Sequence, residues 1–73
     1  MTGIICAMQI EADGIIALSQ NTQTEEIAGM KFTTGTLNGK DIAVVVCGVG
    51  KVNAAMCAVV LIEKFNPDVV INS

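Results

Sequence analysis

The sequence predicts an α/β fold with a mixed central sheet, on three observations. Residues 42–47 form an apolar run without polar alternation, which is typical of a strand covered on both faces. A glycine turn, a helical segment and another apolar strand follow in the order of a β-α-β unit. Asn38 and Gly39 stand between two strand-like segments, a strong signal for an antiparallel hairpin.

Each element of the first half follows from its own residues. Residues 3–7 are apolar, partly β-branched and too few for a helix, so they predict a short buried strand. The apolar positions within 9–19 favour a helix, which Asp13 and Gly14 weaken by roughly 1 kcal/mol each relative to alanine. The polar residues 19–22 are expected to end this helix. Segments 24–28 and 31–37 then predict an antiparallel pair that turns at Gly29.

The second half predicts a strand, a helix and a strand. Residues 42–47 are expected to form a central strand, and Gly48 and Gly50 turn the chain into a helix over 51–65. This helix is apolar nearly all round, so one face can meet the sheet and another must meet something else. Asn66 and Pro67 end it, and 68–72 form a final strand parallel to the strand before the helix.

The composition is that of a large domain's interior. Of the 73 residues, 52% are hydrophobic and only 15% are charged, although a domain of this size buries too little surface to be comfortably stable alone. The last predicted strand also stops at Ser73 with nothing to cover it. We therefore expect residues 1–73 to be the N-terminal portion of a single larger domain, and we expect this fragment to be inactive by itself.

Several function classes are disfavoured. The net charge is −3 and the chain has neither arginine nor histidine, so nucleic-acid binding is not expected. The longest apolar run, 54–62, is about half of a membrane span. No metal site is predicted without histidine or a cysteine cluster. Cys6, Cys47 and Cys57 lie within apolar runs, which favours buried thiols in a reducing compartment, the cytoplasm, over a catalytic thiol.

Candidate binding segments lie where parallel strands end, because ligands collect there in open α/β sheets. These segments are 7–11, 48–51 and 72–73. The turn at 48–51 fits neither phosphate-loop motif. A dinucleotide fingerprint needs glycine at Asn53, and a P-loop needs glycine at Val45 and serine or threonine at Val52. Either a close backbone approach to a ligand or a simple strand-to-helix turn remains open for this segment.

Glu11 is the candidate catalytic carboxylate. It lies in the first turn of its predicted helix, where the helix dipole favours an acidic residue with or without chemistry. Met8 fits either the core or a flexible apolar wall for a ligand. From the residues alone, the structural explanation is the stronger one for both positions.

Four separated blocks of the sequence resemble 5′-methylthioadenosine/S-adenosylhomocysteine nucleosidases. They are Gly3-Ile4-Ile5-Cys6-Ala7-Met8 with Glu11, Thr34-Gly35-Thr36-Leu37-Asn38-Gly39, Gly48-Val49-Gly50-Lys51-Val52-Asn53-Ala54-Ala55 and Pro67-Asp68-Val69-Val70-Ile71-Asn72.

The resemblance implies the N-terminal part of a nucleoside phosphorylase-like three-layer α/β/α fold and hydrolysis of a nucleoside's N-glycosidic bond. It also implies a homodimer with no metal or organic cofactor. By position, Glu11 matches the glutamate that deprotonates the attacking water, and Met8 lies against the ribose. Val49 lines the region of the 5′-thio substituent, and Ala7 belongs to the same loop as Met8. The acid that protonates adenine would lie beyond Ser73.

Three alternatives remain open. Purine or uridine phosphorylases share the fold, but they hold phosphate, for which arginine is the usual residue and which this segment lacks. Futalosine hydrolase resembles the 48–55 block almost as well. A chain without activity, acting as a small self-associating module, would instead use its apolar helix and bare final strand for assembly.

Overall fold

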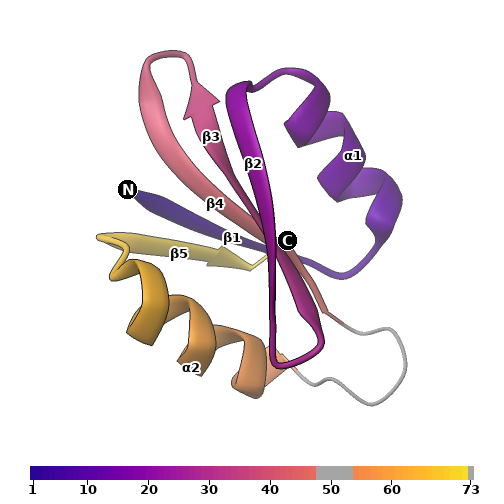
Figure 1. Cartoon of the computed structure of the whole chain (residues 1–73), viewed down its shortest axis with the longest axis vertical. Helices are drawn as coiled ribbons and strands as arrows, with labels where there is room; N and C mark the ends of the chain where they lie inside the picture. The colour runs from indigo at the N-terminus through magenta and orange to yellow at the C-terminus, as the bar shows by residue number, and fades with distance from the viewer. Residues whose placement is uncertain (48–53, 73) are drawn as a thin grey trace.

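The computed structural model describes residues 1–47 and 54–72, which form one mixed sheet with a helix on each face (Figure 1). Five strands lie in the order β2-β3-β4-β1-β5. This arrangement confirms the predicted three-layer α/β/α fold with a mixed central sheet. In chain order the elements are β1 (Thr2–Cys6), α1 (Gln9–Ala17), β2 (Gln20–Ile27), β3 (Met30–Leu37), β4 (Lys40–Val46), α2 (Ala54–Phe65) and β5 (Val69–Asn72).

The sheet is parallel on one side and antiparallel on the other. β1 pairs with β4 and with β5 in parallel, whereas β3 pairs with β2 and β4 in antiparallel fashion. The final strand is therefore parallel to β4, as predicted, but it is not adjacent to it. β1 occupies the position between them, because the crossover through α2 passes over one strand.

The Asn38–Gly39 hairpin has the predicted turn chemistry. Both residues have positive φ, 53° and 78°, as the type I′ turn that suits twisted strands requires. Ala28 and Gly29 connect β2 to β3 with φ of 53° and 80°. This second turn confirms the bend predicted at Gly29, although it places an alanine in a conformation that favours glycine or asparagine.

Side chains along β1 and β4 point alternately to the two faces of the sheet, so they form two hydrophobic clusters, one under each helix. Ile42 and Val44 belong to the cluster that contains Cys6 and Ala12 of α1. Ala43 and Val45 belong instead to the cluster on the α2 side. Successive side chains of a strand point to opposite faces, so a run without polar alternation serves both layers. The prediction that this strand is covered on both faces is confirmed.

α2 covers its side of the sheet through Cys57 and Leu61, which are both fully buried. Gly3 allows this close packing, since a Cβ built there would lie 2.7 Å from Leu61 Cδ2. Near the end of the helix, Phe65 stacks at a tilt on Phe32 of β3, with ring centroids 5.5 Å apart. The predicted helix start at 51–53 lies outside the described residues.

One boundary prediction is wrong. Residues 19–22 were expected only to end the first helix, but β2 already begins at Gln20. β2 is an edge strand, and every residue from Gln20 to Glu26 is exposed. Its sequence therefore does not alternate between apolar and polar residues. An irregular pairing between Gln20 and Gln23, with Asn21 at positive φ, interrupts the register there. Polar edges also discourage pairing with other chains.

The expectation of three free thiols is also wrong. Cys47, directly after β4, and Cys57 of α2 form a disulfide, whereas Cys6 is free and buried as predicted. Their separation of 10 residues gives no recognisable motif, but the β4-α2 crossover folds them together, with Cα atoms 6.6 Å apart. The cysteines therefore no longer argue by themselves for a reducing compartment.

Candidate functional site

The carboxyl ends of β4, β1 and β5 lie side by side at one edge of the sheet. Cys6 pairs with Val46, and Ile5 pairs with Asn72. The backbone N–H of Cys47 donates to the carbonyl oxygen of Cys6 at 2.7 Å, so β4 and β1 stay joined to their ends. The three candidate segments of the sequence thus start from adjacent strands, as a ligand site at this edge requires.

Met8 sets the geometry that places Glu11. It is the N-cap of α1 and is extended, with φ −127° and ψ 143°. Its carbonyl oxygen accepts hydrogen bonds from the N–H groups of Glu11 at 3.2 Å and Ala12 at 3.4 Å. Ala12 is buried against the sheet, so this side of α1 packs on the strands. The first turn therefore holds Glu11 directly beyond the end of β1.

The pKa of Cys6 indicates that the Glu11 carboxylate lies near the end of β1. Burial, and secondarily the negative charge of Glu11, raise the pKa of the Cys6 thiol above its ordinary value of 9.0. Glu11 is itself exposed, so its side chain is accessible from solvent. A thiol with a raised pKa stays protonated and is a poor nucleophile.

The other predicted site residues fall in two groups. Ala7 and Met8 are exposed in the β1-α1 connection, and Met8 keeps 59% of its surface accessible. Of the two interpretations of Met8, core residue or ligand wall, its exposure within the described residues favours the wall. Val49 and the glycine turn at 48–50 lie outside the described residues.

Asn72 is a candidate that the sequence analysis named only as part of a strand end. Its pairing with Ile5 places it one strand away from the segment that leads to Ala7. The available signal was a polar residue that ends an otherwise apolar strand. An amide at this position can donate and accept hydrogen bonds toward a polar ligand at the same edge.

A separate hollow of about 600 Å³ lies between α1 and the face of β2, β3 and β4. Its lining includes Gln9 and Asp13 of α1, Glu26 and Lys31 of the β2–β3 hairpin, and Val44. None of Ala7, Met8 and Glu11 lines it, so the hollow and the strand-end site are different features of the described chain.

Within residues 1–47 and 54–72, no helix combines the length and the hydrophobicity that a membrane span needs.

Curated relatives confirm the resemblance predicted from the four sequence blocks. The chain is 48% identical over 71 residues to a 5′-methylthioadenosine/S-adenosylhomocysteine nucleosidase of Shewanella loihica, and the match covers 97% of this chain and 31% of the relative. It is 46% identical over 70 residues to the nucleosidase of the same name from Lysinibacillus sphaericus, covering 96% of this chain and 30% of the relative. The chain thus spans less than one third of these curated relatives.

Solved structures agree in fold. The nucleosidase of Colwellia psychrerythraea in complex with adenine superposes with a TM-score of 0.89 at 38% identity, covering 97% of this chain and 29% of that one. The nucleosidase of Neisseria meningitidis in complex with methylthio-immucillin-A also gives 0.89, at 30% identity, with 99% and 31% covered. The family model described as "Phosphorylase superfamily" matches residues 2–73. On this match and these folds, the chain belongs to the phosphorylase superfamily.

Proposed function

We propose that the complete enzyme hydrolyses the N-glycosidic bond of 5′-methylthioadenosine or S-adenosylhomocysteine and releases adenine. Relatives of this name match nearly the whole chain, and relatives of known structure bind adenine and a nucleoside analogue. The observation that carries the proposal is the position of Glu11, in the first turn of α1 beyond the end of β1.

The chemistry calls for a carboxylate at such a place. Cleavage of a glycosidic bond through an oxocarbenium-like transition state uses an acid at the leaving group and a base that activates water on the opposite face of the sugar. Glu11 is the proposed base. The proposed acid, which protonates adenine, lies beyond Ser73, so the 73-residue chain is expected to be inactive alone.

Three further residues are proposed to contact the nucleoside. Met8 lies against the ribose, supported by its exposure and by its position one turn before Glu11. Ala7 belongs to the same connection, where a small side chain leaves room for a ligand. Val49 lines the region of the 5′-thio substituent, which is supported by the similarity of the block 48–55 to the nucleosidases.

Hydrolysis is favoured over phosphorolysis because residues 1–73 contain no arginine to hold inorganic phosphate. Methylthioadenosine is favoured over futalosine because the similar proteins from Shewanella and Lysinibacillus bear the nucleosidase name. In this function the enzyme would act in methionine salvage in the cytoplasm.

The test is release of adenine from methylthioadenosine by the complete enzyme in phosphate-free buffer. Glu11→Gln keeps the size of the side chain but removes the base, so substrate binding should persist while kcat falls by roughly 10²–10⁴-fold. Glu26→Gln, the same change on the exposed strand β2, is the matched control and should leave kcat unchanged.

Three outcomes would contradict the proposal. Strict dependence on phosphate would indicate a phosphorylase, and faster turnover of futalosine in a side-by-side assay would indicate the other hydrolase. A Glu11→Gln variant with a nearly normal rate would remove Glu11 from the role of base.

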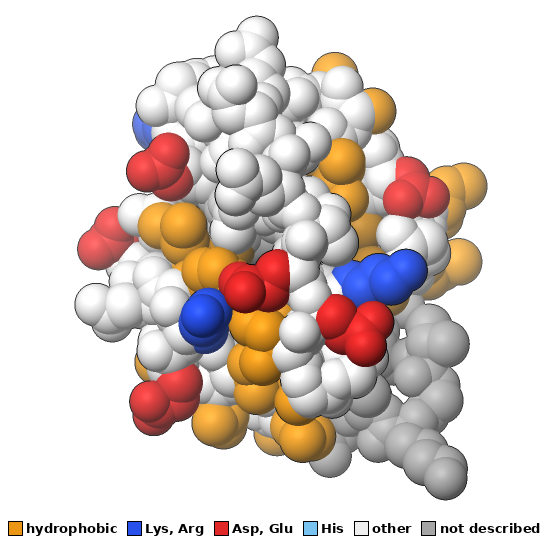
Figure 2. Space-filling model, in the orientation of Figure 1, with side chains coloured by type: hydrophobic (Ala, Val, Ile, Leu, Met, Phe, Trp, Pro, Cys, Tyr) orange, Lys and Arg blue, Asp and Glu red, His pale blue; other side chains and the backbone are white. Residues whose placement is uncertain are grey.

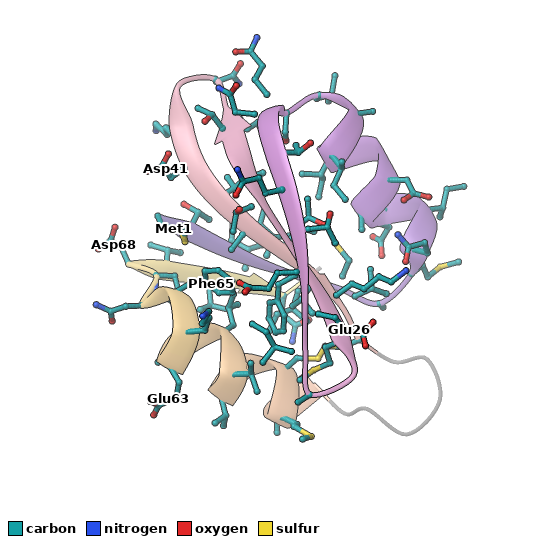
Figure 3. All side chains as sticks on the ribbon, in the orientation of Figure 1. Met1, Glu26, Asp41, Glu63, Phe65 and Asp68 are labelled. Carbon is teal, nitrogen blue, oxygen red and sulfur yellow. A yellow bond between two sulfur atoms is a disulfide. The ribbon has the colours of Figure 1, made fainter. Side chains whose placement is uncertain are left out.

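We also propose that the complete enzyme is a homodimer that uses the outer face of α2. Val59 and Ile62 expose 59% and 50% of their surface, and Ala55 is exposed beside them. Hydrophobic side chains at this spacing share one face of a helix, and the outer face of a soluble α/β layer is normally polar. Glu63 points away from the sheet near one end of this face (Figure 3).

A second copy suits this face because two α2 helices can cross antiparallel at Val59. Each Ile62 then lies near the first turn of the partner helix, and the two Glu63 carboxylates lie at opposite ends of the contact, in the rim. Light scattering of the complete enzyme would give the mass of a dimer, and a monomeric mass would overturn the proposal.

A further inference from the structure

One buried cluster joins the helix that carries Glu11 to the sheet. Ala12 directly follows Glu11 and is the buried residue of α1, with 1% of its surface accessible. Its cluster also contains Cys6, the last residue of β1, together with Ile42 and Val44 of β4. Cys6 is fully buried. The first turn of α1 therefore meets the end of β1 through two small side chains, those of Cys6 and Ala12.

Glu11 and Ala12 belong to one hydrogen-bonded turn. The backbone N–H groups of both residues donate to the carbonyl oxygen of Met8, at 3.2 Å and 3.4 Å. A displacement of Ala12 from the strands therefore carries Glu11 with it. The negative charge of Glu11 also contributes to the raised pKa of the Cys6 thiol, so the carboxylate and the end of β1 are close enough to interact.

The sheet is the more firmly held partner in this contact. β1 is paired with β4 on one side and with β5 on the other, and β4 is paired in turn with β3. The backbone N–H of Cys47 also donates to the carbonyl oxygen of Cys6 at 2.7 Å, which holds the end of β1. A helix satisfies its backbone hydrogen bonds internally and is held on a sheet by side-chain packing. Extra volume at the contact should therefore move α1 and not the strands.

We propose that Cys6 and Ala12 are positioning residues, whose small buried side chains set the distance of Glu11 from the end of β1. The effect on catalysis rests on the proposed function, whereas the packing does not. A general base must lie within hydrogen-bond reach of the water that it activates, and a misplacement of about 1 Å can lower a rate by about 10²-fold. The size of these two side chains thus decides where the base can act.

The first test enlarges the contact from the helix side in the complete enzyme. Ala12→Val adds two carbon atoms and should lower kcat for methylthioadenosine by roughly 10- to 100-fold. The KM should change less, because the displaced carboxylate acts on the attacking water and not on the bound nucleoside. Ala17→Val, the same change at an exposed position of α1, is the matched control and should keep the wild-type kcat. A normal kcat in folded Ala12→Val would overturn the inference.

The second test removes the added volume from the strand side. Cys6→Gly deletes one carbon and one sulfur atom, so the double variant of Cys6→Gly and Ala12→Val has nearly the wild-type number of atoms at the contact. It should recover most of the lost kcat. A helix that was merely destabilised would not be rescued in this way, because glycine weakens a strand further. A double variant as slow as Ala12→Val would show that the two side chains do not act as a pair.

Crystal structures of the complete variants separate this inference from the proposed function. The distance between the Cα atoms of residues 6 and 11 should increase in Ala12→Val by on the order of 1 Å and return in the double variant. An unchanged distance in Ala12→Val would refute the positioning. If the wild-type enzyme does not hydrolyse methylthioadenosine, the proposed function fails, and this distance still decides the role of the pair. Cys6→Val enlarges the same contact from β1 and replaces Ala12→Val in both measurements if that variant does not fold.

Discussion

At the scale of single residues, an ion pair joins the start of the chain to Asp68, the residue directly before the last strand. The amino group of Met1 donates to Asp68 Oδ2 at 2.8 Å, and the backbone N–H of Asp68 donates to the carbonyl oxygen of Met1 at 2.8 Å (Figure 3). The hydrogen bond from this amino group, and secondarily its positive charge, lower the pKa of Asp68 below the ordinary value of 3.8. Folding therefore favours the ionised form of the Asp68 carboxyl group.

We predict that Asp68→Asn lowers the free energy of unfolding of the protein, by an amount that depends on pH. Because the folded pKa is depressed, the wild-type advantage is fully present above pH 3.8 and is lost as the pH falls through the folded value. Denaturant unfolding of both proteins over this range measures the advantage, and a difference that is constant with pH would contradict the prediction.

Glu11 shows how far sequence reasoning reaches at this scale. Its position beyond a buried strand was predictable, because the run 3–7 could only be a strand and a helix had to follow it. The chemistry of the position came from the resemblance. The partnership of Cys47 and Cys57 was not predictable, because their approach depends on how the crossover folds and not on any local pattern.

At the scale of elements, the two helices differ in how closely they meet the sheet. α2 packs so tightly that Leu61 occupies the space that a side chain at Gly3 would need. In α1, nothing lies within 4 Å of a Cβ built at Gly14. The two glycines therefore serve different purposes, and the same substitution should have opposite effects at the two positions.

We predict that Gly3→Ala destabilises the protein by about 1–3 kcal/mol, since the fully buried Leu61 side chain would have to shift to admit the added methyl group. Gly14→Ala is the matched control and should stabilise it by about 0.5–1 kcal/mol, because alanine loses less backbone entropy in a helix. Urea unfolding of each variant provides the comparison. A neutral Gly3→Ala would mean that α2 does not press on β1 as closely as the distances indicate.

Prediction of the elements was most reliable where burial decides the sequence. The central strand and both hairpin turns followed from an apolar run and from glycine or asparagine positions. The start of β2 was missed because an exposed edge strand places no apolar requirement on its residues. The position of β5 beside β1 was also missed, because the crossover rule fixes handedness and parallel direction but not the number of strands passed over.

At the scale of the whole molecule, hydrophobic side chains reach the surface in several places between scattered charges (Figure 2). One such surface is the outer face of α2, defined by Ala55, Val59 and Ile62. We predict that Val59→Glu converts the proposed dimer of the complete enzyme into a monomer, because two carboxylates would meet at the centre of the contact. Light scattering after gel filtration measures the mass.

The control for this prediction is Leu18→Glu, which introduces the same charge at an exposed apolar residue next to α1. It should leave the mass unchanged. Thermal unfolding of both variants should remain cooperative, which separates a lost contact from a lost fold. A dimer that persists in Val59→Glu would place the interface elsewhere.

The division of the core between two helices has a thermodynamic consequence. Residues under α1 and residues under α2 are attached to the same strands but touch opposite sides of them, so they share few neighbours. Free-energy changes on the two sides should then sum, and Gly3→Ala combined with Gly14→Ala should differ from the sum of the single variants by less than about 0.5 kcal/mol. The sheet would then separate the two clusters energetically. Residues on the α2 side could change in evolution without disturbing α1, the helix that carries Glu11.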